Sequence, residues 1–431
     1  MFKGKPQDRK HSGALVLILV AALILASCAG GSTKTSDTNT GTPAGPKSST
    51  QGISDTSIKL GAFGPLTGET SWIGLGARSG LELAIDQINE HGGINGRKIN
   101  LKFISADGPA ASLSAARQLV EREKVYALLI GGGSTGAAAV ADYARSNGIP
   151  TYNMLGATPT IREPFSTNIF HGAGPSAPAL AQYLVDGLAQ LKPRPQRVGV
   201  IHGTYEYPKS EYDVVKPLIR EKRYELVADE AFDLGDTDFT AQLAAMSSAN
   251  VDAVVFLGHF TEGALILRQA SAGALPDARW VIDSASAIPG LPKAVGEAAD
   301  GSISYFIMPQ YLDESADPME SFEKAWRQKF GEPPKDRPNY VDLAGYGDMF
   351  VLANVIKAAG EDLTWGNLIS TWNRMKEVSP SDFATYGLDV IFPESFSSEN
   401  HQGNRCHATI QIRSKAWKVI GENCDPKISD I

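Results

Sequence analysis

The stretch IKLGAFGPLTGETSWIGLGARSGLELAIDQINEHGGINGRKINLKFI, residues 58–104, decides the fold class of this chain. It begins and ends with short apolar runs, at 58–63 and 99–104, of the length expected for buried β-strands. Between the runs, apolar residues recur at the spacing of one helix face, at Leu81, Ala84, Ile85 and Ile88. A strand, a helix and a second strand in this order are typical of a parallel sheet flanked by helices.

The same alternation continues along the chain. Further apolar runs occur at residues 125–130, 198–202, 251–257 and 280–283. The chain has 431 residues, 42% of them hydrophobic, which is long for a single core, so we predict an α/β protein with two lobes. Its formal net charge is −8 and it has no basic run, which argues against nucleic acid as a partner.

The first residues are typical of a secretory signal peptide, because basic residues precede an apolar run at 14–26 that is short for a transmembrane helix. The run ends in Leu-Ala-Ser-Cys28, which resembles the lipobox of bacterial lipoproteins, where the cysteine carries the lipid. We expect residues 1–27 to be removed and Cys28 to become a membrane anchor. Residues 28–53, rich in Ser, Thr, Gly and Pro, are predicted to form a flexible tether.

The other two cysteines, Cys406 and Cys424, lie near the end of the sequence. In an exported protein we expect them to form a disulfide that closes a small loop. A metal site that also uses His401 and His407 is the alternative, but the spacing matches no zinc signature. We therefore predict neither a metal nor a cofactor.

Several short motifs point to a known family. They are IKLG at 58–61, GPLTG at 64–68, GGINGR at 92–97, AD at 106–107 and GIP at 148–150. Together they resemble the type I periplasmic binding proteins, specifically the leucine/isoleucine/valine-binding branch of transport receptors. The resemblance implies two doubly wound parallel-sheet lobes that are joined by a hinge of three crossovers and close on a ligand. The lobes are expected at residues 54–175 plus 310–385 and at 176–309 plus 386–431.

The resemblance places one side of the ligand site in the first lobe. Trp72 follows the first strand, where the family has an aromatic residue that covers the ligand. Ser134 and Thr135 follow three glycines at the start of a helix, so their hydroxyls and backbone amides are predicted to bind a carboxylate. A second turn matches the family's other carboxylate-binding segment, at Gly156, Ala157 and Thr158. Simple helix capping is the alternative role for Ser134 and Thr158.

The other side of the site is expected in the second lobe. Tyr207 stands where the family has an aromatic residue after a strand, and His259 and Phe260 stand where it has another. Asp283 ends a strand near the family's acidic residue that holds an α-ammonium group. His259 replaces the family's tyrosine and the acid is shifted by one position, so the amino-acid identity of the ligand stays open.

Two enzyme motifs overlap in the glycine-rich stretch 131–136. G-x-S-x-G is the nucleophile elbow of serine hydrolases, with Ser134 as nucleophile and His259 or His401 as base. G-x-G-x-x-G is a dinucleotide signal, but the strand at 151–154 ends without the acidic residue that holds a ribose. Gly-rich stretches match such motifs by chance, so we predict a binding protein and keep the esterase as an alternative.

The resemblance also implies a location and partners. We expect an exported substrate-binding protein of an ABC importer, anchored by lipid at the outer face of the cell membrane. As a monomer it would deliver an amino acid, or a related carboxylate or amide, to a permease. A receptor that reports the same ligand to a separate signalling protein is the second alternative.

Overall fold

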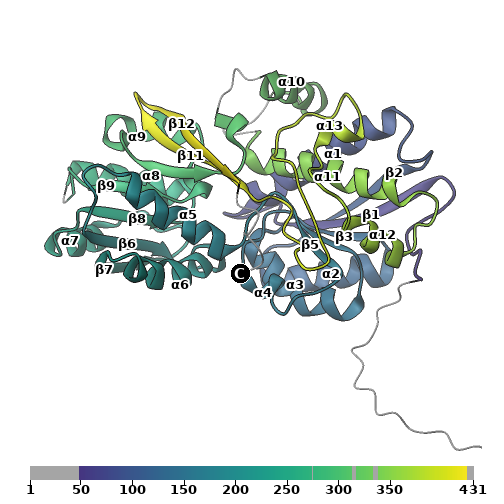
Figure 1. Ribbon diagram of the computed structural model, residues 1–431, viewed down its shortest axis with the longest axis horizontal. Coiled ribbons are helices and arrows are strands. Elements are labelled where there is room, and N and C mark those ends of the chain that lie inside the picture. Colours follow the sequence, from purple (N-terminus) through teal and green to yellow (C-terminus); the bar gives the residue numbers. More distant parts are fainter. Residues whose placement is uncertain (1–47, 274, 313–316, 333–337, 425–431) are drawn as a thin grey trace, which may run out of the picture. The chain divides into compact units, whose positions relative to one another are not determined.

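The computed structural model describes residues 48–273, 275–312, 317–332 and 338–424. The predicted signal peptide and the anchor at Cys28 lie outside this part of the chain. Two β-sheets organise the described residues (Figure 1). No helix among them combines the length and the apolar character needed to cross a bilayer.

The first sheet has five parallel strands in the order β2-β1-β3-β4-β5. The strands are β1 (Ser57–Gly64), β2 (Lys98–Ser105), β3 (Ala127–Ile130), β4 (Thr151–Asn153) and β5 (Ile169–His171). The helices between them are α1 (Ser71–Glu90), α2 (Gly108–Arg117) with its π-helical extension η1 (Gln118–Arg122), α3 (Gly133–Asn147) and α4 (Pro159–Arg162). The two runs that bound residues 58–104 therefore form neighbouring strands, as predicted.

The second sheet has seven strands in the order β12-β11-β10-β9-β8-β6-β7. Its parallel strands are β6 (Arg197–Gly203), β7 (Glu225–Phe232), β8 (Ala253–Leu257), β9 (Arg279–Ile282) and β10 (Ile303–Phe306). Its helices are α5 (Ala177–Gln190), α6 (Glu206–Glu221), α7 (Thr240–Ser248), α8 (Phe260–Ala272), η2 (Ser284–Ser286), α9 (Gly290–Val295) and η3 (Gly296–Ala299). A yellow antiparallel hairpin in Figure 1 completes it with β11 (Cys406–Arg413) and β12 (Ala416–Cys424).

The five parallel strands of each sheet follow one topology. The order β2-β1-β3-β4-β5 of the first sheet is repeated as β7-β6-β8-β9-β10 in the second. Strand order therefore reverses beside β1 in one sheet and beside β6 in the other, which makes both sheets doubly wound. We call each sheet with its helices a lobe; the predicted fold class is confirmed.

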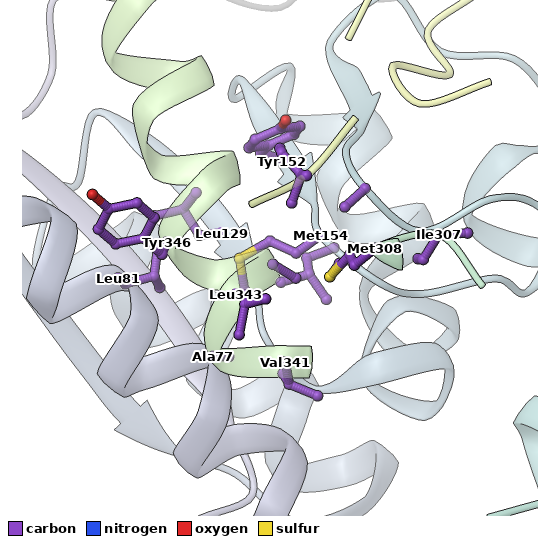
Figure 2. Close-up of a cluster of buried hydrophobic side chains, with 14 of the residues drawn as sticks. Ala77, Leu81, Leu129, Tyr152, Met154, Ile307, Met308, Val341, Leu343 and Tyr346 are labelled. Carbon is purple, nitrogen blue, oxygen red and sulfur yellow. The ribbon is translucent and has the colours of Figure 1, made fainter. Parts of the chain in front are cut away.

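A further set of helices packs on the first lobe. It comprises η4 (Pro309–Leu312), α10 (Asp317–Phe330), α11 (Tyr340–Ala359), α12 (Trp365–Trp372) and α13 (Pro380–Phe383). Helix α11 lies against α1, and a Cβ added at Gly80 would come within 2.1 Å of the Asp342 carbonyl oxygen. Glycine therefore permits the close approach of the two helices. Figure 2 shows the buried cluster at this contact, with Leu81 next to Leu343 and Tyr346.

The chain passes between the lobes three times: between β5 and α5, after β10, and just before β11. The last passage comes later than residue 385, because Glu394 still accepts a hydrogen bond from Tyr152 of β4 and Gln402 still accepts one from Arg162 of α4. We therefore propose that the first lobe comprises the described residues within 48–175 and 310–404, and the second those within 176–309 and 405–424.

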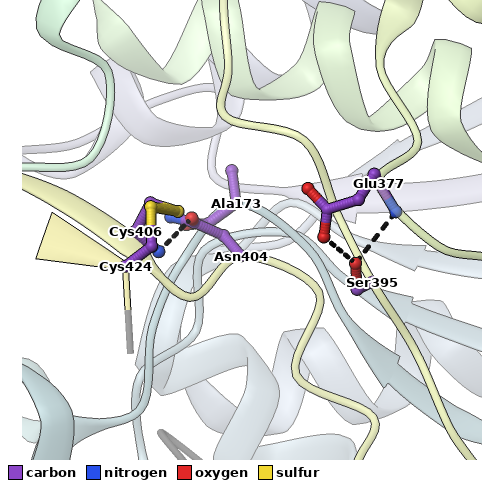
Figure 3. Close-up of a disulfide and its surroundings, with 6 residues drawn as sticks. All are labelled: Ala173, Glu377, Ser395, Asn404, Cys406 and Cys424. Atoms are coloured by element: carbon purple, nitrogen blue, oxygen red, sulfur yellow. Dashed lines mark hydrogen bonds between the residues drawn. A yellow bond between two sulfur atoms is a disulfide. The ribbon is translucent and has the colours of Figure 1, made fainter. Parts of the chain in front are cut away.

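The folded body begins earlier in the chain than expected, and the disulfide near its other end is present as predicted. The tether was expected to reach residue 53, yet the Gln51 amide donates to the carbonyl oxygens of Val120 and Val125. Residues 48–53 thus belong to the folded body, because buried acceptors of the first lobe hold them. The predicted disulfide is present: Cys406 and Cys424 face each other across the β11–β12 pair and are joined (Figure 3).

Candidate functional site

Two adjoining cavities lie where the reversals of strand order predict a ligand site, outside the carboxyl ends of β1, β3, β6 and β8. The first encloses about 560 Å³ of space not filled by protein atoms, partly open to solvent. We call it the apolar cavity; its walls are Trp72, Ile73, Gly133, Ser134, Leu155, Gly174, Pro175, Leu180, Tyr207, His259, Ser284, Ala285, Ile307, Tyr340 and Val341.

The second cavity encloses about 1010 Å³ on the same measure. We call it the acidic cavity because Glu69 and Asp107 are among its walls. The two cavities share four residues: Ile73, Ser134, Tyr207 and His259. Both lobes therefore contribute to each cavity, which is the arrangement that a ligand-closed pair of lobes requires.

Aromatic rings from both lobes meet in the apolar cavity. Trp72, in the first turn of α1, lies edge-on to His259, which precedes α8, with 5.3 Å between ring centroids. Tyr340, at the start of α11, lies 5.9 Å from Trp72, and Tyr207 lies 5.8 Å from His259. Trp72, Tyr207 and His259 thus come together as the sequence predicts, whereas Tyr340 was missed because its segment follows the second passage between the lobes.

His259 is the polar side chain at the centre of this group. It is 8% exposed, and neither ring nitrogen has a hydrogen-bond partner among the described residues. Its backbone N–H donates to the Tyr205 hydroxyl, which fixes the start of α8. Burial lowers the pKa of His259 to about 4, so the ring is neutral at physiological pH. A neutral imidazole offers one donor and one acceptor to a ligand.

Ser134 lies in the first turn of α3 and borders both cavities. Its hydroxyl oxygen accepts the Ala157 N–H at 3.0 Å, which leaves the hydroxyl proton for another acceptor. Gly132, the N-cap residue that precedes the helix, supplies no side-chain cap. The first-turn amides of α3 and the Ser134 hydroxyl are therefore hydrogen-bond donors beside the cavities. Thr135 borders the acidic cavity alone.

Three predicted contacts of the first lobe do not border either cavity. The Gly156 N–H donates to Asn153 Oδ1, and the Ala157 N–H is the donor to Ser134. The Thr158 hydroxyl donates to Glu206 of the second lobe. These donors have partners within the protein and so support the loop, while the contact of these three residues with a ligand stays a prediction.

Asp283 and Phe260 of the second lobe are also set back from the cavity walls. Asp283 is fully buried, and Oδ1 accepts from the Tyr207 hydroxyl at 2.7 Å, the Ala285 N–H at 3.0 Å and the Ser284 hydroxyl at 3.4 Å. Oδ2 accepts from the Gly258 N–H at 3.1 Å. Burial raises the pKa of Asp283 to about 6. The carboxylate therefore orients Tyr207 and the strand ends, and its contact with a ligand stays a prediction.

A second buried acid, Glu211, lies on the same side of the site. It is fully buried, and among the described residues neither carboxyl oxygen has a hydrogen-bond partner. Burial, followed by the charge of Asp283, raises its pKa well above the usual range, which favours the protonated form. Glu211 stands four residues after Tyr207 on α6, so helical spacing was the signal that could have found it.

The described residues assemble neither the esterase triad nor the metal site that the sequence left open as alternatives. The Ser134 oxygen is bonded to the Ala157 N–H and to neither histidine proposed as its base, while His401 Nδ1 lies 2.7 Å from the Ile169 carbonyl oxygen. Cys406 and Cys424 are in a disulfide and are therefore unavailable as thiolate ligands. In the described part of the chain, no group of three or more His, Cys, Asp and Glu side chains is arranged to hold a metal.

The structure thus has two doubly wound lobes with ring-lined cavities between them. The family model described as periplasmic binding protein matches residues 57–416, and the chain belongs to that family. A Leu/Ile/Val-binding protein homolog of Brucella melitensis is 33% identical over 222 residues, 49% of this chain and 57% of the relative. The match thus spans little more than half of that relative.

A longer match is the leucine-, isoleucine-, valine-, threonine- and alanine-binding protein of Pseudomonas aeruginosa, 25% identical over 308 residues, 70% of this chain and 79% of the relative. Among solved structures, LivJ from Streptococcus pneumoniae with isoleucine has a TM-score of 0.68 and 22% identity, covering 86% of this chain and 99% of that one. An R. palustris solute-binding protein with benzoate has a TM-score of 0.69 and 19% identity, covering 86% and 98%. These structural similarities support the fold.

Proposed function

We propose that this protein is an exported, lipid-anchored substrate-binding protein of an ABC importer, which captures a small molecule between its lobes and presents it to a permease. One observation carries the proposal: Ser134 of the first lobe and Tyr207 and His259 of the second border the same cavities. A ligand that contacts both lobes only when they are closed stabilises closure by its differential affinity. Relatives named for leucine, isoleucine and valine support a small ligand.

The contacts we assign to the ligand are Trp72, Ser134, Tyr207 and His259, with Tyr340 added from the structure. They are side chains with rings or hydroxyls, which suits binding without chemical conversion of the ligand. The family suggests that the protein acts as a monomer, and the closed lobes would form the surface that the permease recognises.

Ligand binding is tested by thermal and chemical denaturation of the purified protein after refolding to remove any retained ligand. The panel is amino acids, amides, small aromatic acids, sugars and polyamines. A ligand at 100 times its Kd adds about 2.7 kcal/mol to the free energy of unfolding. Stabilisation by one chemical class supports the proposal, and no stabilisation by any class contradicts it.

The importer role and the anchor need separate experiments. Deletion of the gene is expected to abolish uptake of the radiolabelled ligand by cells; undiminished uptake would instead favour a signalling receptor. Mass spectrometry of the mature N-terminus is expected to find a diacylglycerol group on Cys28 that the Cys28→Ala variant lacks.

A further inference from the structure

Hydrogen-bond donors gather on one side of the apolar cavity. The Ser134 hydroxyl oxygen accepts the Ala157 N–H, so the hydroxyl itself can donate into the cavity. Ser134 also stands in the first turn of α3, where backbone amides lack a side-chain cap. Helix N-termini and hydroxyl donors together favour an anionic oxygen, such as that of a carboxylate.

His259 is a second and independent sign of a ligand in this cavity. Its side chain is 8% exposed, borders the cavity, and has no hydrogen-bond partner for its ring nitrogens within the described residues. An unpartnered buried polar group is costly unless a ligand or water satisfies it. As a neutral ring, His259 adds an N–H donor opposite Ser134 without adding a charge.

No described residue that borders the apolar cavity is an aspartate or a glutamate. The nearest candidate, Asp283, already accepts four donors from its own lobe, which is about the number that a carboxylate can take. An α-ammonium group in this cavity would therefore meet rings, aliphatic groups and the neutral polar side chains of Ser134, His259 and Ser284, but no carboxylate. It would lose its hydration without gaining a carboxylate partner.

The acids of the neighbouring cavity do not change this conclusion. Glu69 and Asp107 are both exposed to solvent, where attraction between charges is weak. Glu211 borders neither cavity, and its raised pKa favours the uncharged form. The buried part of the site thus favours a ligand with a carboxylate at one end and an apolar remainder. It has no charged partner for a buried cation of the ligand.

We infer that the apolar cavity selects small apolar or aromatic carboxylates that lack an α-ammonium group. This inference rests on the proposed function and names the substrate class of that same site. Asp283 then acts as a positioning residue, which holds the Tyr207 hydroxyl, instead of as a ligand contact.

The test uses pairs of compounds that differ only in the α-ammonium group: phenylalanine with 3-phenylpropionate, and leucine with 4-methylpentanoate. Calorimetric titration of the refolded protein is expected to show at least tenfold tighter binding of one or both acids than of the matching amino acid. Equal binding, or tighter binding of the amino acids, would overturn the inference and leave the proposed function intact. Binding of only sugars or polyamines would do the same, whereas no binding by the whole panel would overturn both.

A pair of variants tests the carboxylate end. Ser134→Ala is expected to weaken binding of the acid at least tenfold and binding of its primary amide by less than threefold. Ser146→Ala is the control on the same helix, because this exposed hydroxyl donates to the Asp142 carbonyl oxygen and borders neither cavity, and it should change both affinities less than threefold. Equal losses for acid and amide in Ser134→Ala would overturn the assignment of the carboxylate to this end of the cavity.

Discussion

The Thr158 hydroxyl donates a hydrogen bond of 2.6 Å to Glu206 Oε1, and so ties the loop after β4 in the first lobe to the first residue of α6 in the second. The same hydroxyl oxygen accepts the Thr160 N–H at 3.4 Å and caps α4. Glu206 is partly exposed, whereas Thr158 is buried. The bond is thus a direct contact between the lobes that does not involve the cavity walls.

Removing this contact should weaken ligand binding without touching the ligand. A hydrogen bond to a charged group contributes about 1.5–3 kcal/mol, and partial exposure favours the lower value. We expect Glu206→Ala to lower affinity about tenfold, because the closed form loses a contact that the open form lacks. Calorimetry gives the affinity, and small-angle scattering gives the fraction of closed protein.

The controls test whether Thr158 and Glu206 act on affinity as one contact. Thr158→Val should lower affinity by a similar factor, and the double variant should lose little more than either single variant. Thr160→Val, at an exposed side chain two residues away, should have no effect. Additive losses in the double variant would show that the two residues act separately.

Asp283 and Tyr207 should behave as one unit in binding. Tyr207→Phe removes the donor at 2.7 Å and leaves a buried carboxylate with one acceptor unfilled, at a cost of about 1–3 kcal/mol in stability. We expect Asp283→Asn to lower the affinity for an amino acid and for its des-amino analogue by the same factor, because Asp283 acts through Tyr207. Titration of both compounds into each variant measures this.

The double variant completes that comparison. If Asp283 only positions Tyr207, adding Asp283→Asn to Tyr207→Phe should lower affinity less than threefold further. A loss confined to the amino acid in Asp283→Asn would show instead that the carboxylate contacts the ammonium group.

Stability should fall with rising pH because of two buried acids in the first lobe, Asp348 and Glu394. Tyr152 donates to Glu394 Oε2 at 2.5 Å, and the Ala173 N–H donates to Asp348 Oδ1 at 3.2 Å. Burial raises the pKa of Glu394 to about 8; burial and then the Glu394 charge raise the pKa of Asp348. The folded state thus holds protons that the unfolded state releases, so stability is lost between about pH 4.5 and pH 8.

Glu394→Gln should reduce this loss, because the amide keeps an acceptor for Tyr152 and does not ionise. We expect the free energy of unfolding, from urea titrations at pH 5.5 and 8.5, to fall by about 1–3 kcal/mol less in the variant than in the unmodified protein. Glu377→Gln is the control, since this exposed carboxylate accepts the Ser395 hydroxyl in the same region (Figure 3). An equal fall in the free energy of unfolding between pH 5.5 and 8.5 in the unmodified protein and both variants would contradict the assignment of this loss of stability to Glu394.

The disulfide should stabilise the end of the second lobe. Cys406 and Cys424 are 18 residues apart, and a loop of this size is expected to contribute about 3 kcal/mol by restricting the unfolded chain. Replacing both with alanine should lower the urea midpoint and make it insensitive to reductant. The unmodified protein should lose stability only when reductant is added; equal stability with and without reductant would contradict this role.

The hairpin also anchors the last passage between the lobes. The Cys406 N–H donates to Asn404 Oδ1 at 2.9 Å, and the Asn404 amide donates to the Ala173 carbonyl oxygen at 3.0 Å (Figure 3). Asn404 thus joins the third passage between the lobes to the first, and it lies two residues before the disulfide-bonded Cys406. This relation was invisible in the sequence, where residues 173 and 404 are far apart.

Local patterns predicted most of the parallel strands, because a buried strand carries its signal in consecutive apolar residues. They missed β7, Glu225–Phe232, because charged residues interrupt its apolar ones at the edge of the sheet. No local pattern marks the last passage, because residues 386–402 have no regular secondary structure and are held by buried polar side chains such as Glu394.

By itself, the sequence determined the fold class, the family, the disulfide pair and four residues of the cavity walls: Trp72, Ser134, Tyr207 and His259. The fold class follows from strand and helix periodicity, the disulfide from the two remaining cysteines of a chain expected to be exported, and the family and the four wall residues from short motifs and the resemblance they carry. Only the tertiary structure decided that Asp283 is saturated by its own lobe, that Thr158 reaches Glu206, and that Tyr340 enters the cavity. Each of these depends on how loops distant in sequence meet, and no local pattern contains that information because many long-range contacts determine it together.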